Sequence, residues 1–190
     1  MSPGYLTATP DVNSSPDVYS SNKDITVTGV LGQQGSFFIV RQTNYKSWKT
    51  VSYNLTLPTS RGLLSIPYLG GNLTLDGRDS KIHVTDYPVD DALMIYCTAE
   101  IFTWQKYFNR TILVVYGGMG ETHEIMMSRD PHEALFTLAS VGVLLQVEGP
   151  QFYAQWQVTE ERRWLRVGNL FVHLIGESFG IEELSRSTVC

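Results

Sequence analysis

The chain has 190 residues and a net charge of −5, with 43% hydrophobic and 17% charged residues. This length suits one large domain or two small ones with a real core. The net negative charge and the lack of a Lys and Arg cluster argue against a nucleic-acid partner. No apolar run is long enough to span a bilayer, which argues against a membrane partner.

Apolar and polar residues alternate through the first half, a pattern typical of half-buried strands. The segments 24–30 and 36–41 flank a Gly-Gln-Gln-Gly turn, which predicts a hairpin over 25–41. A further strand is expected over 52–57, ending at Pro58 because proline cannot continue a ladder. Short strands are expected over 63–66, 73–75 and 81–85, separated by turns at Gly70-Gly71 and Asp76-Gly77.

Longer strands are expected after Pro88. The segments 92–104, 111–116 and 123–128 suggest a meander, with 117–120 (Gly-Gly-Met-Gly) as the hairpin turn between the last two. Further strands are expected over 134–139, 143–147, 152–158, 164–167 and 170–175, and a helical turn only over 181–186. Turns recur about every ten residues, which is the spacing of a β-sandwich. Trp104 and Trp156 occupy alternating apolar positions and are expected in its core.

Three runs carry a family resemblance: LDGRDSKIHVTDY at 75–87, YCTAEIFTW at 96–104 and VYGGMGE at 115–121. In this order, and with the opening residues 2–6 (SPGYL), they resemble the second domain of the multidomain fungal β-galactosidases of glycoside hydrolase family 35. The resemblance extends over about residues 2–175.

The resemblance implies an all-β fold: antiparallel hairpins over 1–88 and an immunoglobulin-like β-sandwich over 89–176. The tail, 177–190, departs from the family pattern. In that family the catalytic glutamates lie in a preceding TIM barrel, and the reaction is retaining hydrolysis of terminal β-galactosides. We therefore expect a non-catalytic accessory domain whose partners are the barrel and the other β domains. The alternatives are a stand-alone carbohydrate-binding module and a secreted interaction protein.

Four acids could in principle serve catalysis: Glu100, Glu121, Glu124 and Glu133. Retaining glycosidases need two carboxylates about 5 Å apart, and nothing in the sequence pairs these acids. Glu100 shares strand parity with Phe102 and Trp104, which would turn it inward. We expect structural roles and no catalytic residue.

Histidines beside acids raise the possibility of a metal site. The runs at 121–124 (Glu-Thr-His-Glu) and 132–133 (His-Glu) lack the His-Glu-x-x-His pattern that places two imidazoles on one helix face. His83 and His173 stand alone in alternating strands. The sequence therefore predicts neither a metal nor a cofactor.

Trp48 lies in a polar loop and is a weak candidate for sugar binding. The two cysteines do not suggest a disulfide, because Cys97 falls in an apolar strand and Cys190 is the last residue. We expect a buried thiol at Cys97 and an exposed thiol at Cys190.

Four of the seven asparagines satisfy the glycosylation pattern Asn-x-Ser/Thr: Asn13, Asn54, Asn72 and Asn109. This frequency, together with the family resemblance, predicts an extracellular protein, although no signal peptide follows Met1. A Ser/Thr-rich β protein that collects such sites by chance is the alternative.

A domain that packs against neighbours should expose apolar side chains where they meet it. We expect such a patch at Tyr5-Leu6 and around Leu174-Ile175. In the tail, Phe179, Ile181 and Leu184 are the apolar residues that would cover it.

Overall fold

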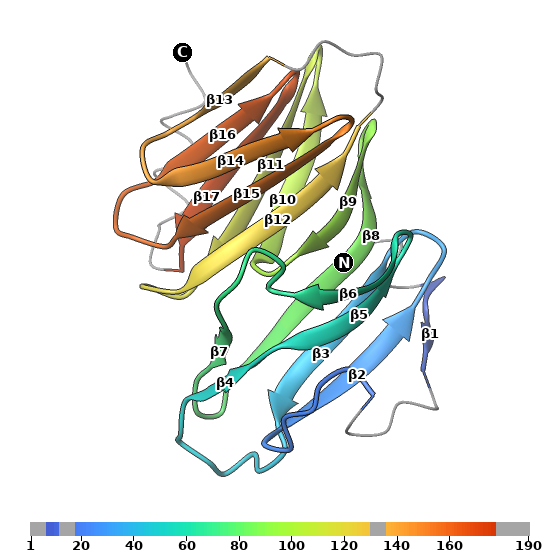
Figure 1. The fold of residues 1–190 in the computed structure, drawn as a ribbon, viewed down its shortest axis with the longest axis vertical. Coiled ribbons are helices and arrows are strands. Elements are labelled where there is room, and N and C mark those ends of the chain that lie inside the picture. Colours follow the sequence, from blue (N-terminus) through green and yellow to red (C-terminus); the bar gives the residue numbers. More distant parts are fainter. Residues whose placement is uncertain (1–6, 12–17, 130–135, 178–190) are drawn as a thin grey trace.

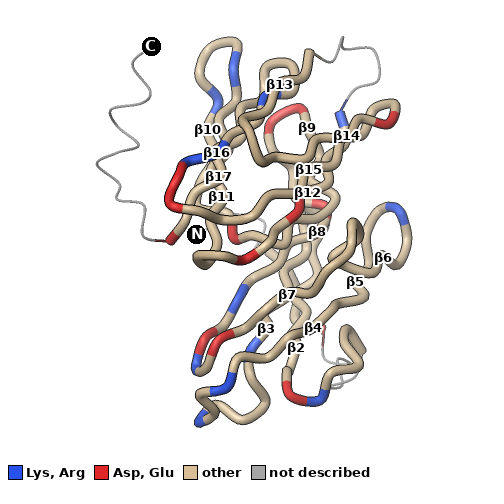
Figure 2. Tube along the Cα trace, turned by 60° about the vertical axis from the view of Figure 1, so that its left-hand side comes forward, with Lys and Arg blue, Asp and Glu red and all other residues tan. Residues whose placement is uncertain are grey.

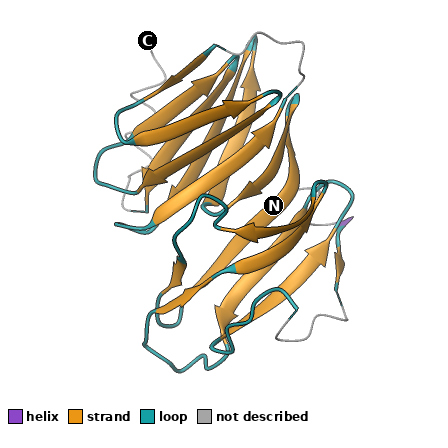
Figure 3. Ribbon diagram, viewed as in Figure 1, coloured by secondary structure: helices purple, strands orange, loops and turns teal. Residues whose placement is uncertain are grey.

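The computed structural model describes residues 7–11, 18–129 and 136–177. These residues form seventeen strands, arranged as two large sheets and two small ribbons, and no complete helix lies among them (Figure 1, Figure 3). All pairings between these strands are antiparallel except that of β11 with β17. The prediction of an all-β, antiparallel sandwich fold is confirmed.

The larger sheet has eight strands and runs the length of the molecule (Figure 1). Their order across the sheet is β1-β2-β3-β8-β9-β12-β15-β14. Their bounds are Thr9–Pro10 (β1), Ile25–Leu31 (β2), Ser36–Gln42 (β3), Ser80–Val89 (β8), Ala92–Cys97 (β9), Thr122–Ser128 (β12), Val143–Glu148 (β14) and Gln151–Gln157 (β15). The predicted hairpin over 25–41 is β2 and β3.

A five-stranded sheet packs on one end of the larger sheet, and the two ribbons lie nearer its other end (Figure 1). The five strands run in the order β10-β11-β17-β16-β13, with bounds Glu100–Tyr107 (β10), Arg110–Gly117 (β11), Thr137–Ala139 (β13), Arg163–Val167 (β16) and Leu170–Gly176 (β17). One ribbon pairs β4 (Val51–Tyr53) with β7 (Leu73–Leu75), and the other pairs β5 (Leu55–Thr59) with β6 (Gly62–Ile66).

Two hydrophobic cores lie on opposite faces of the larger sheet. The sandwich core, between the two large sheets, includes Leu113, Ile125, Phe152, Trp156, Leu165 and Val172. The ribbon core, beneath the ribbons, includes Phe38, Tyr53, Leu57, Ile66, Leu75 and Tyr96. In β12, Met127 faces the first core and Met126 the second. Because both faces are covered there, the middle of the strand, Ile125 to Met127, is a continuous apolar run rather than an alternating pattern.

The two tryptophans expected in the core differ in burial. Trp156 is 3% exposed and belongs to the sandwich core. Trp104 is partly buried and packs against that core without being one of its fully buried residues, so the prediction holds only in part for this residue. It lies on β10, an edge strand whose register shifts between Ile101 and Thr103. That bulge also breaks the parity expected for Phe102, which is exposed.

The connections around residues 98 and 117 differ from the predicted meander. The strand expected over 92–104 divides at Thr98-Ala99, and its halves, β9 and β10, join different sheets. The segment 117–121 carries the chain from β11 in the smaller sheet to β12 in the larger one, so it is not a hairpin turn. Glycine-rich segments indicate a change of direction but not which strand pairs next.

Two shorter predictions also need correction. The strand expected over 52–57 breaks at Asn54, because β4 pairs with β7 and β5 pairs with β6. β5 continues through Pro58, which lies opposite Leu63; a strand with one partner tolerates a proline. The Asp76-Gly77 turn forms, with the amide of Asp79 donating to the carbonyl of Asp76 at 3.1 Å, but the strands beside it do not pair with each other.

The predicted boundary at residue 88 falls within β8, which pairs with β9 across it. The larger sheet therefore continues from one predicted subdomain into the other, and the division into 1–88 and 89–176 stays a prediction. Leu174 and Ile175 are buried at 2% and 6% exposure, so the apolar patch expected there is wrong. Tyr5-Leu6 and the tail residues Phe179, Ile181 and Leu184 lie outside the described residues, as does the helical turn over 181–186.

Candidate functional site

Glu124 is buried, at 1% exposure, and fastens the β6–β7 connection to the larger sheet. Its carboxylate accepts hydrogen bonds from the backbone amides of Tyr68 and Leu69, the latter at 2.9 Å. The hydroxyl of Tyr96 donates to it at 2.8 Å. Burial and this carboxylate raise the pKa of the Tyr96 hydroxyl. Both carboxylate oxygens are thus used by neighbouring groups, which is the geometry of a structural anchor.

Glu121, directly before β12, is the centre of a second polar cluster. It pairs with the Lys81 ammonium, accepts from His123 Nε2 at 2.9 Å and accepts from Thr74 Oγ1 at 3.0 Å. Burial alone would raise the pKa of this carboxyl, but the bonds from His123 and Lys81 outweigh burial and lower it. The cluster links β7, β8 and β12 and keeps the carboxylate ionised.

His83 is fully buried beside this cluster and contacts the hydroxyl of Tyr53 through Nε2 at 2.8 Å. Burial, aided by nearby His123 and Lys81, lowers the pKa of His83 to about 3. His173 on β17 is half-buried, and burial lowers its pKa as well. Among the described residues no group of three or more His, Cys, Asp or Glu is placed to hold a metal ion.

Glu100 begins β10 and accepts a hydrogen bond from the backbone amide of Ile82 at 3.2 Å. Burial raises the pKa of its carboxyl. Like Glu124, it is bound to a neighbouring strand. Glu133 and His132 lie outside the described residues.

Trp48 is 72% exposed and rests against the turn at 76–79. The guanidinium carbon of Arg78 lies 3.8 Å from the centre of its indole ring, and a side chain at Gly77 would overlap with the Trp48 backbone. Arg78 has a φ of 65°, a left-handed conformation that is uncommon outside glycine. Buried Gln42 supports the same contact by donating to the carbonyls of Lys49, at 2.6 Å, and Asp76, at 3.0 Å.

A surface depression of about 560 Å³ lies beside Trp48. Its other lining groups are mostly polar: Lys23, Asp24, Gln42, Thr43, Asn44, Ser47 and Lys49, with Val51. An exposed aromatic ring beside amides, hydroxyls and charges offers both the stacking and the polar contacts that a sugar needs.

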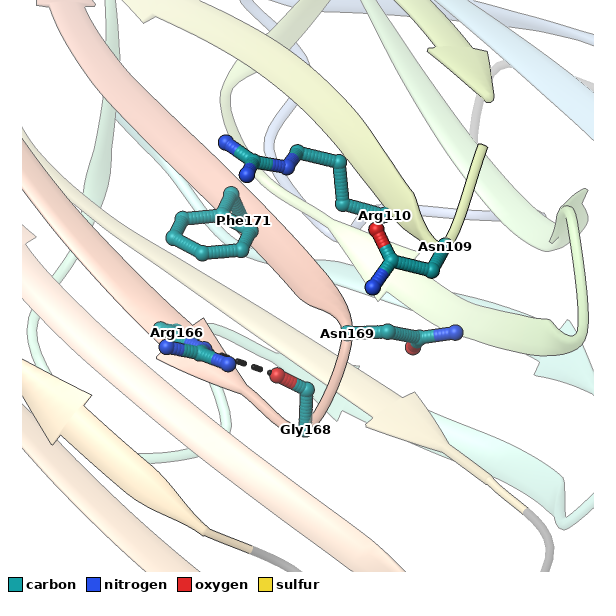
Figure 4. Close-up of a pocket in the computed structure, with 6 residues that line it drawn as sticks. All are labelled: Asn109, Arg110, Arg166, Gly168, Asn169 and Phe171. Atoms are coloured by element: carbon teal, nitrogen blue, oxygen red, sulfur yellow. Dashed lines mark hydrogen bonds between the residues drawn. The ribbon is translucent and has the colours of Figure 1, made fainter. Parts of the chain in front are cut away.

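A second pocket, of about 260 Å³, lies at the end of the five-stranded sheet (Figure 4). It is lined by Asn109, Arg110, Arg166, Gly168, Asn169 and Phe171. The guanidinium carbons of Arg166 and Arg110 lie 4.8 Å and 5.6 Å from the centre of the Phe171 ring. Sequence reasoning did not group these residues, because the parallel pairing of β11 with β17 brings them together from distant segments.

The described glycosylation-pattern asparagines, Asn54, Asn72 and Asn109, are all exposed and lie between strands. Asn13 lies outside the described residues. Cys97 is a buried free thiol, and burial raises its pKa to about 12. Cys190 is not among the described residues.

Charged residues of both signs are spread over the turns and strand ends (Figure 2). The described ranges contain no helix long and apolar enough to cross a membrane.

Residues 7–179 match the family described as "Beta-galactosidase, domain 2". The chain belongs to this family. This β-galactosidase domain 2 is 46% identical over 178 residues to β-galactosidase A of a Penicillium species, and 46% identical over 176 residues to that of Aspergillus niger. It is 45% identical over 175 residues to β-galactosidase A of Aspergillus oryzae. Each match covers 92% of this chain but only 17–18% of the relative. The resemblance to fungal β-galactosidases is thereby confirmed.

Proposed function

We propose that this chain is a non-catalytic, structural domain of a secreted β-galactosidase that hydrolyses terminal β-galactosides. Its partners would be the catalytic TIM barrel and the other β domains of that enzyme. The observation that carries the proposal is the extent of the match: nearly the whole chain corresponds to less than a fifth of each relative.

The geometry of the acids supports a structural role. Catalysis of glycoside hydrolysis needs a carboxyl pair that reaches the substrate. Glu124 is buried under the β6–β7 connection, and the carboxylate of Glu121 is held by Lys81 and His123.

An activity assay of the purified chain tests the proposal. We expect no hydrolysis of a chromogenic β-galactoside. Turnover that survives repurification and is abolished by Glu124→Gln or Glu100→Gln would refute it. As a positive test, this chain should substitute for the matching segment of the A. niger enzyme and leave the activity of that enzyme within a few-fold.

A carbohydrate-binding module is the second candidate, because Trp48 is exposed, rigidly held and beside a polar depression. A glycan array with the purified chain tests it. Binding that is lost in Trp48→Ala and kept in Tyr45→Ala, another exposed aromatic of the same loop, would favour this function.

A further inference from the structure

The pocket of Figure 4 is built by two turns that meet at one end of the five-stranded sheet. One is the turn between β10 and β11, where Tyr107 pairs with Arg110. The other is the turn between β16 and β17, where Val167 pairs with Leu170. The amide of Thr111 donates to the carbonyl of Asn169 at 3.0 Å and fixes the two turns side by side. The pocket therefore lies between two turns that are hydrogen-bonded to each other, and not between independent loops.

Asn109 lines this pocket and is also the acceptor residue of an Asn-Arg-Thr glycosylation pattern. Its side chain is exposed, and Figure 4 shows its amide nitrogen turned toward the space between Phe171 and Asn169. The nitrogen that a glycan would modify thus faces a cavity that has an aromatic ring and two guanidinium groups in its wall.

We propose that Asn109 carries an N-linked glycan whose first N-acetylglucosamine occupies this pocket. The donor would be an oligosaccharide carried on a polyprenyl pyrophosphate. Transfer forms the bond from sugar C1 to Asn109 Nδ2 and breaks the bond from C1 to the pyrophosphate oxygen. The amide loses one proton, and the lipid pyrophosphate leaves with the electron pair.

The chemistry of the pocket matches an N-acetylhexosamine. The half-buried ring of Phe171 offers an apolar surface for the C–H groups of the sugar. Arg110 and Arg166 offer N–H donors for the acetamide carbonyl and the hydroxyls. Arg166 is already positioned, because its Nε donates to the carbonyl of Gly168 at 2.9 Å. The cavity is below the roughly 300–1,000 Å³ typical of drug-sized ligands, so it suits one sugar residue.

The threonine of the pattern has a structural use of its own. Thr111 is 1% exposed, and its hydroxyl donates to Asp90 at 2.6 Å. This bond accounts for a threonine at position 111, but not for the asparagine whose amide faces the pocket. Glycans are transferred to chains that have not yet folded, so the burial of Thr111 does not prevent modification.

The test uses the chain secreted from yeast with Asn13, Asn54 and Asn72 changed to Gln, so that Asn109 is the single acceptor. Mass spectrometry measures occupancy at Asn109. Thermal unfolding then compares three forms: the intact glycan, a form trimmed by an endoglycosidase to one N-acetylglucosamine, and a form freed of glycan by an amidase. Because the amidase turns Asn109 into Asp, Asn109→Asp and Asn109→Gln made without glycan serve as controls.

We expect Asn109 to be occupied, and the intact and trimmed forms to unfold about 2–4 °C above the freed form, the shift that roughly 1 kcal/mol produces in a domain of this size. In Phe171→Leu with Arg166→Gln, this glycan-dependent difference should disappear, whatever the baseline stability of that variant. An unoccupied Asn109, or equal unfolding temperatures for all three forms, would overturn the proposal.

Discussion

Buried polar side chains join the ribbons to the larger sheet. Glu124 holds the β6–β7 connection, Glu121 binds Lys81 and His123, and His83 meets Tyr53 of β4. Each of these contacts spans more than 20 positions of the sequence, except the pairing of Glu121 with His123. Such groups stabilise only while they stay paired, since an unpaired buried donor or charge is costly.

Glu124→Gln tests this at one residue. The amide that replaces the carboxylate has one acceptor oxygen, while the Tyr68 and Leu69 amides and the Tyr96 hydroxyl all donate toward this position. We expect a loss of about 2–3 kcal/mol in the free energy of unfolding, measured by urea denaturation. Glu148→Gln, at an exposed position, is the matched control and should change stability by less than about 0.5 kcal/mol. Equal effects of the two substitutions would contradict the anchoring role.

Because His83 is buried, we expect the free energy of unfolding to depend on pH. Its folded pKa of about 3 lies below the ordinary value of 6.5, so the unfolded chain binds this proton more readily. The stability it contributes is fully present above pH 6.5 and declines as the pH falls toward 3, by up to about 1.4 kcal/mol per pH unit. Half-buried His173 acts in the same direction, and so does Glu121, whose lowered carboxyl pKa makes the stability fall further as the pH drops below about 4.5.

Urea denaturation of His83→Gln at pH 7 and pH 5 measures this effect. The glutamine cannot titrate, so the decline between the two pH values should be smaller than in the parent chain. His173→Gln serves as the comparison and should flatten the profile less, because His173 is only half-buried. A decline in His83→Gln equal to that of the parent would exclude the proposed linkage.

At the scale of elements, local patterns were sufficient for some features and not for others. Alternation and turn residues predicted the β2–β3 hairpin, because its two strands are adjacent in sequence and pair with each other. The same signals could not reveal that β9 and β10 separate into different sheets, or that β11 pairs in parallel with β17. These choices depend on burial of whole faces, which no short window of sequence contains.

The residues of the candidate sites were likewise predictable from the sequence only where the signal is local. Asn109 was recognised from three consecutive residues, while the pocket around it needs Arg166 and Phe171 from strands that are remote in sequence. Trp48 was correctly placed in a loop, but its support by Gly77 and Arg78 depends on how that loop packs.

The segment 117–121, which carries the chain from β11 in the smaller sheet to β12 in the larger one, can be tested by substitution. Gly117 passes so close to the His123 ring that an added Cβ would overlap with it, whereas a Cβ at Gly176, its register partner on β17, would meet Val158 at an ordinary 3.4 Å. Gly117→Ala must displace His123 from Glu121 and should lower stability by about 1–3 kcal/mol. Gly176→Ala should change it by less than 1 kcal/mol. Thermal unfolding of the two variants measures these losses. A larger loss of stability in Gly176→Ala than in Gly117→Ala would contradict this description of the segment 117–121.

For the whole molecule, the continuous larger sheet has consequences for folding. The sandwich core and the ribbon core share strands β2, β3, β9, β12 and β15, and in the last four of these strands successive residues face different cores. Loss of either core removes the cover from one face of these strands. The two predicted subdomains, 1–88 and 89–176, therefore depend on each other through the sheet that crosses their boundary.

We accordingly expect the chain to unfold in one cooperative transition. Leu57→Ala in the ribbon core and Leu113→Ala in the sandwich core each remove a fully buried side chain and should cost about 2–5 kcal/mol. Because the cores share strands, both substitutions should shift the same transition, followed by far-UV circular dichroism and by tryptophan fluorescence. Trp156 is 3% exposed in the sandwich core, so fluorescence reports mainly on that core, while circular dichroism follows the strands of both cores. Two separate transitions, with each substitution lowering only one, would show that residue 88 divides independent folding units, and a soluble, folded fragment 1–88 would establish the same point.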